Sequence, residues 1–275
     1  MKNILQILVP IFFTFPVLVN GQNIYSAIHL NDKENINKEK VERIIETNTF
    51  YNQSGKEVKK NIKYLNVNNQ CVREDRFKSD ELIAKLSYEY DSISNLEISR
   101  TFERWNKIVV YSKEKSNYIY NKQNQLVRIE DVNGNNVMFR ITKIVPNEKG
   151  HPISMKVFNG QDKQFSGEEK AEYIYKQNKY MSINYYLKGN EITRDTAIID
   201  FRENHKFEDS KREYNDNGDL VKSTRSPKEY YQYEYKYDER GNWKSQKVYK
   251  IKLNKRGKGK GKLVSKYERR IDYKE

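Results

Sequence analysis

Hydrophobic and polar residues alternate with a period of two along much of the chain, most clearly between residues 231 and 253. Aromatic side chains stand at every second position, Tyr231, Tyr233, Tyr235 and Tyr237, and Gln, Glu and Lys fill the positions between them. A period of two places the aromatic side chains on one face of a strand and the polar ones on the other. This segment therefore predicts a half-buried β-strand.

A turn and a second strand follow directly. Asp238 can accept hydrogen bonds from backbone N–H groups just ahead of it, and Gly241 can adopt a positive φ without steric cost. The alternation then resumes at Trp243. The pattern predicts a β-hairpin whose structural residues are Tyr235, Tyr237, Asp238, Gly241 and Trp243.

Weaker copies of this hairpin pattern recur along the chain. They lie at residues 51–58, 88–96, 118–126, 173–180 and 214–220. In the copy at 214–220, Tyr214 and Gly218 take the structural positions, and in the copy at 118–126 Asn124 is the residue able to adopt the left-handed conformation. The copies and the alternating runs between them predict an all-β fold, a repetitive antiparallel meander of β-hairpins with about 12–16 strands.

The best copy also carries a resemblance to a known family. Its sequence over residues 235–243, Tyr-x-Tyr-Asp-x-x-Gly-Asn-Trp, resembles the YD repeat of the Rhs and teneurin families, and residues 214–220 match in part. In those families the repeats are hairpins added side by side into a long, coiling antiparallel sheet. The resemblance implies the same kind of extended or coiling sheet here, although the copies are irregularly spaced, and it does not imply a particular function.

The first 21 residues have the pattern of a secretory signal peptide. Lys2 supplies a positive start, residues 4–19 are mostly apolar, and small or tolerated residues precede Gln22, where we expect cleavage. A membrane anchor is the alternative, but Pro10 and Pro16 interrupt an apolar run that is short for a span of about 20 residues. The sequence therefore predicts a bacterial protein that is exported to the periplasm, the cell surface or the medium, with no membrane span after cleavage.

Composition sets the expected organisation of the rest. Residues 22–40 are polar and predict a linker, and residues 41–275 predict one hairpin-repeat domain with a basic C-terminal hairpin. The content of 22 Tyr and 11 Phe is too high for a disordered chain, while 33% charged residues suit a thin sheet. The single cysteine, Cys71, excludes an internal disulfide, and we expect it to be a buried small side chain and not a reactive thiol.

The net charge is +14, and the most biased segment is the Lys-Gly alternation near the C-terminus. Two interpretations of this segment stay open. It is either a solvated hairpin loop whose glycines relieve turn strain, or an anion-binding finger formed by Arg256, Lys258, Lys260 and Lys262. The tyrosine stripe is open in the same way, either as sheet packing or as an exposed platform for glycans or a protein partner. An envelope polyanion, a glycan or a protein would be the expected partner, and export disfavours nucleic acid.

Nothing in the sequence points to catalysis, a metal or another cofactor. His29, His151 and His205 are far apart and have no neighbours at metal-ligand spacing, and no nucleophile motif is present. Adjacent acids such as Glu74 and Asp75 point to opposite faces of a strand. We therefore expect a non-catalytic binding or scaffolding protein of the bacterial envelope or surface. The alternatives are an envelope hydrolase acting on glycans through acids on the sheet face, and an accessory or immunity partner of a secreted toxin.

Overall fold

The computed structural model describes residues 23–34, 36, 40–105, 111–185, 189–199 and 211–274. It is an all-β fold built on one sheet of 17 antiparallel strands, with one short α-helix, α1 (Ile24–Ile28), and one 3-10 turn, η1 (Tyr175–Gln177). The predicted fold class, an antiparallel meander of hairpins, is confirmed. The strand number is slightly above the expectation because some hairpins have no tyrosine pattern to reveal them. The predicted signal peptide and Gln22 lie outside the described residues, and so does His205.

The strands follow one another along the chain. They are β1 (Val41–Asn52), β2 (Gly55–Leu65), β3 (Cys71–Lys78), β4 (Glu81–Tyr90), β5 (Glu97–Arg104), β6 (Ser112–Tyr120), β7 (Leu126–Asn133), β8 (Met138–Pro146), β9 (Pro152–Asn159), β10 (Phe165–Ile174), β11 (Lys179–Tyr185), β12 (Glu191–Ile198), β13 (Arg212–Tyr214), β14 (Leu220–Ser226), β15 (Glu229–Tyr237), β16 (Trp243–Leu253) and β17 (Gly259–Tyr273).

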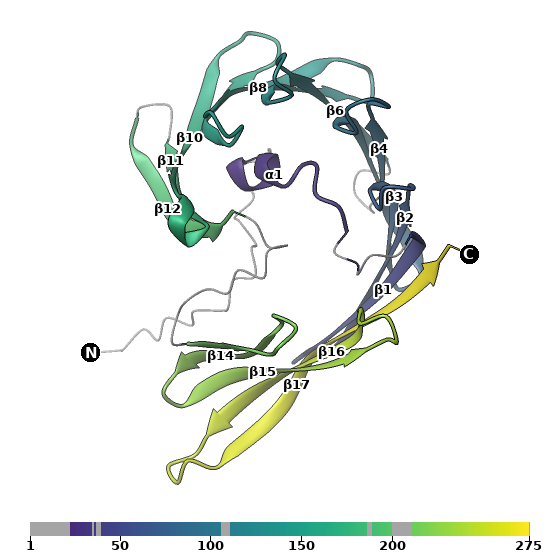
Figure 1. The fold of residues 1–275 in the computed structure, drawn as a ribbon, viewed down its shortest axis with the longest axis vertical. Coiled ribbons are helices and arrows are strands. Elements are labelled where there is room, and N and C mark those ends of the chain that lie inside the picture. The colour runs from purple at the N-terminus through teal and green to yellow at the C-terminus, as the bar shows by residue number, and fades with distance from the viewer. Residues whose placement is uncertain are drawn as a thin grey trace.

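The two ends of the described chain meet inside the sheet. Strand β1 pairs with β2 on one side and with the last strand, β17, on the other, with Ile44 opposite Ile271 and Phe50 opposite Ser265. From this pair the ladder continues through β2 to β12 in one direction and through β16 back to β13 in the other. The sheet curves strongly, and α1 lies inside the curve (Figure 1). We call the face of the sheet that carries α1 the concave face.

One turn design recurs at seven of the hairpins between the described strands. At residues 238–242 the Asp238 N–H donates to the Asn242 carbonyl, the Asp238 carboxylate accepts from the N–H groups of Arg240 and Asn242, and Gly241 has a φ of 80°. The predicted turn and the positive φ of Gly241 are confirmed. The same turn begins at six other residues: Asn66, Asn121, Asn133, Asn147, Asn215 and Asn254. The fourth position is always left-handed, which explains why it is Gly or Asn, including the predicted Gly218 and Asn124.

The tyrosines that precede these turns link each hairpin to the one before it. Each donates its hydroxyl to the backbone carbonyl of the first residue after the preceding turn on the same rim of the sheet. The four such bonds run from Tyr90 to Cys71 (2.8 Å), Tyr120 to Glu97 (2.7 Å), Tyr173 to Pro152 (2.7 Å) and Tyr235 to Leu220 (3.2 Å). The repeated tyrosine is thus a tether between neighbouring hairpins, because a half-buried phenol needs a hydrogen-bond partner.

The main apolar core lies on the concave face under α1. Ile24 of α1 is fully buried there against Met155 and Tyr180. The helix is held by its Asn23 cap and by the Ile24 N–H, which donates to the Glu169 carboxylate at 2.7 Å. The segment that the polarity of residues 22–40 predicts as a linker therefore includes a packed element. Ile24 is buried, and Ala27 and Ile28 pack partly against the same core, because the three residues fall on one side of the helix.

Candidate functional site

A cavity of about 610 Å³ opens on the concave face between β14 and β17. Its lining is rich in aromatic side chains, and besides them it includes Arg225, Gln246 and Ser265. The aromatic residues are Phe50, Tyr231, Tyr233, Tyr235 and Tyr267. We call it the tyrosine cavity. Concave sites with aromatic walls and a few polar groups are the usual form of a ligand site.

Strand pairing explains how residues from four strands reach this cavity. Tyr233 of β15 stands opposite Val248 of β16, which stands opposite Ser265 of β17, which in turn stands opposite Phe50 of β1. Residues directly opposite each other in an antiparallel pair share a face. The predicted aromatic stripe of β15 is thereby confirmed, and Tyr231, Tyr233 and Tyr235 form the centre of the cavity wall.

The tyrosines differ in how firmly they are held. The Tyr235 hydroxyl donates to the Leu220 carbonyl and accepts from the Gln246 side chain at 2.5 Å. Burial raises the pKa of Tyr233 and of Tyr235, so both stay neutral phenols at neutral pH. Tyr231 is flanked by cations, since Arg225 Cζ lies 5.5 Å and Lys250 Nζ 6.0 Å from its ring centroid. One wall of the cavity is therefore electropositive.

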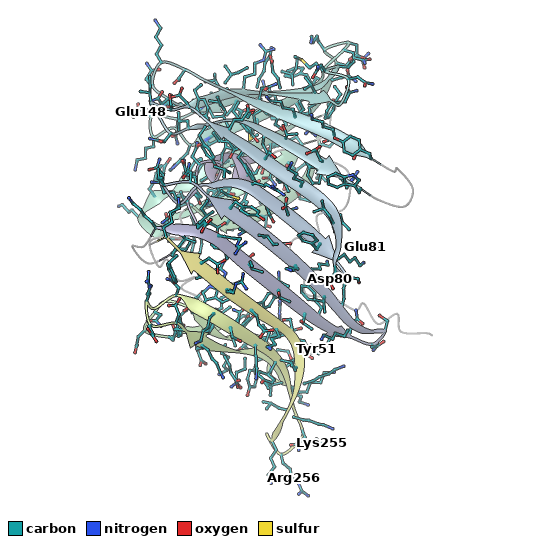
Figure 2. All side chains as sticks on the ribbon, turned by 90° about the vertical axis from the view of Figure 1, so that its right-hand side faces the viewer. Tyr51, Asp80, Glu81, Glu148, Lys255 and Arg256 are labelled. Carbon is teal, nitrogen blue, oxygen red and sulfur yellow. The ribbon has the colours of Figure 1, made fainter. Side chains whose placement is uncertain are left out.

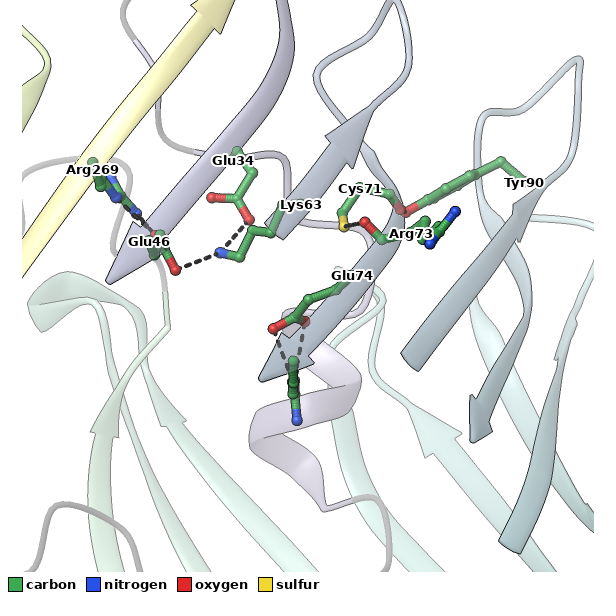
Figure 3. Close-up of polar contacts among 9 residues, drawn as sticks. Glu34, Glu46, Lys63, Cys71, Arg73, Glu74, Tyr90 and Arg269 are labelled. Atoms are coloured by element: carbon green, nitrogen blue, oxygen red, sulfur yellow. Dashed lines mark hydrogen bonds and ion pairs between the residues drawn. The ribbon is translucent and has the colours of Figure 1, made fainter. Parts of the chain in front are cut away.

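The next part of the concave face holds a network of ion pairs (Figure 3). Glu46 accepts from Arg269 at 2.7 Å and lies 3.6 Å from Lys63 Nζ, which also pairs with Glu34 at 2.7 Å. Burial alone would raise the pKa of Glu46, but Lys63 and Arg269 outweigh it and lower the pKa. Glu74 is held by Arg76 through two bonds of 2.9 and 3.0 Å. These carboxylates are neutralised by their partners, which ties the 23–34 segment to the sheet.

Two further carboxylates lie deeper on this face, and neither touches the tyrosine cavity. Asp131 accepts from Arg140 and Ser116, each at 2.6 Å. Glu97 is almost fully buried, and burial raises its pKa to about 7, while Arg100 opposes that rise. Among the described residues, no Asp or Glu lines the cavity. A glycosidase would need two carboxylates facing a bound sugar, and the cavity does not provide that pair.

The structure separates the residues predicted as one anion-binding finger. Arg256 and Lys258 belong to the turn between β16 and β17, where Asn254 caps their N–H groups and Gly257 has a φ of 74°. Figure 2 shows Lys255 and Arg256 at the far tip of this hairpin. Lys260 and Lys262 lie instead in β17, opposite Lys252 and Lys250. Only these two of the four predicted residues are placed next to the tyrosine cavity.

The glycines of this hairpin have different roles. Gly257 supplies the left-handed position of the turn, as the solvated-loop interpretation expects. Gly259 and Gly261 lie in β17 against Ile251, and an added Cβ would come within 2.9 and 3.0 Å of its side chain. Gly259 and Gly261 are therefore required because a larger residue would clash with Ile251, and not because the turn needs a positive φ there.

The remaining predicted structural residues lie at the turn rim. Tyr237 accepts from Asn215 at 3.0 Å and donates to Asp219, which joins the turn after Tyr214 to the turn after Tyr237. Trp243 is half-buried under Arg269, whose Cζ lies 3.9 Å from the ring centroid. These residues connect hairpins and do not line the cavity.

Cys71 and two histidines are also placed by the structure. Cys71 is half-buried, and burial raises its pKa to about 12, which makes it a poor nucleophile. His29 contacts Asp32 at 2.6 Å, and His151 stacks on Tyr173 and Tyr175. Within the described ranges no cluster of three or more metal-ligating side chains is found.

Sequence reasoning missed Phe50, Arg225 and Tyr267 as cavity residues. Phe50 and Tyr267 come together only through the pairing of β1 with β17, which joins segments more than two hundred residues apart. Arg225 lies in a strand with no aromatic alternation. The pairing of the first and last strands leaves no local signal, so only the alternation within β15 could have pointed to this cavity.

Comparison with known proteins gives little further information. No family model matches the sequence, and no curated protein matches it. Among solved structures, the chain is similar to a porin-like protein from Bacteroides uniformis, with 10% sequence identity and a TM-score of 0.45, over 84% of this chain and 96% of that one. The relationship to YD-repeat proteins stays a prediction. No helix in the described part of the chain has the length and apolar character needed to cross a membrane.

Proposed function

We propose that the chain is an exported, non-catalytic binding protein of the bacterial envelope or surface, and that its tyrosine cavity binds a glycan chain. The observation that carries this proposal is the aromatic wall of Tyr231, Tyr233 and Tyr235 on the concave face. Aromatic faces pack on the apolar faces of sugar rings, and Arg225 and Gln246 supply directional hydrogen bonds to hydroxyl groups. The volume of about 610 Å³ suits a short stretch of sugar residues.

The alternative of an envelope hydrolase is less well supported. The cavity wall contains no carboxylate among the described residues. Glu229, two residues from Tyr231 on the same face, is paired with Lys250, and Glu46 and Glu74 further along that face are held by Lys63, Arg269 and Arg76. A carboxylate in such a pair is a poor general acid, because the cation favours its ionised form. Binding without turnover is the function that these contacts support.

A glycan array with the purified protein tests the proposal. We expect binding to at least one class of oligosaccharide, and we expect Tyr233→Ala to abolish it because the substitution removes the centre of the aromatic wall. Tyr249→Ala is the matched control, since Tyr249 stands opposite Gln232 on the other face of the same hairpin. Binding that both variants lose equally, or no binding to any glycan, would contradict the proposal.

A further inference from the structure

The charged side chains beside the tyrosine cavity form an unusual arrangement. In the β16–β17 hairpin, Lys252 stands directly opposite Lys260, and Lys250 stands directly opposite Lys262. Like charges at directly opposed positions of an antiparallel pair destabilise it. The two pairs lie on the same face, because Lys250 and Lys252 are two residues apart in β16 and Lys260 and Lys262 are two residues apart in β17. We call these four residues the lysine ladder.

Little in the described structure compensates this repulsion. Lys250 pairs with Glu229 at 2.9 Å, and the side chains of Lys252, Lys260 and Lys262 have no ion pair among the described residues. The ladder thus presents four positive charges with one carboxylate. The backbone there is held in place by Ile251, which packs on Gly259 and Gly261 from the opposite face. The lysines are therefore displayed on a rigid strand pair.

The ladder leads into the tyrosine cavity. Tyr231 stands opposite Lys250, and Glu229 stands opposite Lys252, so the ladder and the aromatic wall share one face. Arg225 lies over the other side of Tyr231 and also lines the cavity. Strand β1 ends its pairing with β17 at Ser265, so Lys260 and Lys262 lie beyond the paired part of β17. A ligand chain that leaves the cavity along β16 would pass directly over the ladder.

We infer that the ligand of the tyrosine cavity is an acidic polysaccharide, whose carboxylate or sulfate groups are bound by the lysine ladder and Arg225. This inference rests on the proposed function and adds the charge of the ligand to it. An anionic chain removes the repulsion between the opposed lysines, whereas a neutral chain leaves it in place. The ladder on β16 and β17 adjoins the aromatic wall on β15, and this extent over three adjacent strands favours an extended polymer over a single small anion.

Paired polymers that differ only in charge test the inference. Dextran and dextran sulfate differ in sulfate, and methyl-esterified and free polygalacturonate differ in carboxylate. We expect the protein to bind at least one acidic member more tightly than its neutral partner. Lys260→Gln with Lys262→Gln should lower that affinity about tenfold at low ionic strength, and the loss should shrink with added salt as the charges are screened.

The same hairpin offers a matched control. Arg256→Gln with Lys258→Gln removes the same charge from the tip, which lies away from the ladder, and should change the affinity by about twofold or less in low salt. Lys260→Arg with Lys262→Arg keeps the charge and should retain binding. Equal losses from the ladder and tip variants would overturn the inference, because they would mean unspecific attraction to a basic protein.

The outcomes separate this inference from the function on which it rests. If neutral and acidic polymers bind equally well and Tyr233→Ala abolishes both, the role of the lysine ladder is contradicted and the glycan site stands. Binding that Tyr233→Ala leaves unchanged would overturn the glycan site itself. Thermal melts of each variant accompany the titrations, and we expect the ladder variant to melt at or slightly above the wild-type temperature because the repulsion is gone.

Discussion

The two halves of the concave face are built from the same hairpin unit but are filled in different ways. Over β6 to β12 the face is covered by α1, and Ile24 packs there against Met155 and Tyr180. Over β14 to β17 the corresponding face carries the tyrosine cavity. The covered half packs aliphatic side chains and tyrosines into a closed core under α1, whereas the open half carries its tyrosines on the wall of a cavity beside lysines. Among the described residues α1 fills one of these regions, and under our proposal a ligand fills the other.

The largest expected effect comes from breaking the covered half. Ile24→Ala removes a fully buried side chain, and large-to-small core substitutions of this kind cost about 2–5 kcal/mol. Urea unfolding monitored by circular dichroism would measure the loss. Val67→Ala, at a residue that is 64% exposed, is the control and should change the free energy of unfolding by less than about 0.5 kcal/mol. Equal effects of the two substitutions would mean that α1 does not pack on the sheet.

A pH dependence should come from Glu97, which begins β5 at the border of the covered half. Burial raises the pKa of Glu97 from 4.5 to about 7, so the folded state binds its proton more tightly than the unfolded state does. The resulting stabilisation is present below about pH 4.5 and is lost as the pH rises through 7, with a magnitude on the order of 3 kcal/mol. Urea unfolding of wild type and Glu97→Gln at several pH values would measure it.

We expect the free energy of unfolding of the Glu97→Gln variant to change much less between pH 5 and 7 than that of the wild type. An identical dependence of stability on pH in both proteins would show that the Glu97 carboxyl is not buried as the structure has it.

The next prediction concerns the turn at residues 238–242, which joins β15 to β16 in the open half. Gly241→Val places a β-branched side chain at a φ of 80° and should destabilise the protein by about 1 kcal/mol or more. Thermal melts would measure it. For a matched pair, Gly241→Ala should be costly and Gly134→Ala nearly neutral, because Gly134 has no positive φ and an added Cβ there makes only ordinary contact with Lys113. A neutral Gly241→Val would mean that the turn is placed wrongly.

The smallest expected effect concerns the tyrosine tethers that both halves share. Tyr120→Phe removes the hydrogen bond of 2.7 Å to the Glu97 carbonyl, together with a longer one of 3.4 Å from Asn31, and should cost about 1 kcal/mol. Tyr249→Phe, on the outer face, should be close to neutral. Chemical unfolding of the two variants would measure their free energies of unfolding. Equal values would contradict the idea that the tyrosine recurs because its hydroxyl links neighbouring hairpins.

The sequence predicted the repeating parts of this fold well because their signals are local. The alternation around Tyr233 and the Asp238–Gly241 spacing determine a strand and a turn within a few residues, and both are confirmed. The pairing of β1 with β17 has no local signal, so Phe50 and Tyr267 could not be placed together. The packing of α1 was missed because Ile24 stands in a polar segment.

The candidate site was predictable only in part for the same reason. Lys260 and Lys262 were visible in a basic run, but their register opposite Lys252 and Lys250 depends on a bulge between Val248 and Tyr249 that the sequence does not reveal. Without that register, the ladder could not be distinguished from the charged tip at Arg256.

Hydrogen exchange with bound ligand tests the central claim, that the open half of the concave face is the binding surface, most directly. The protein would be compared with and without dextran sulfate, or whichever polymer binds in the titrations. We expect the ligand to slow amide exchange in peptides from residues 220–267 and to leave peptides from residues 112–185, which include the strands under α1, unchanged. Protection confined to residues 112–185, or spread evenly over the sheet, would contradict the account.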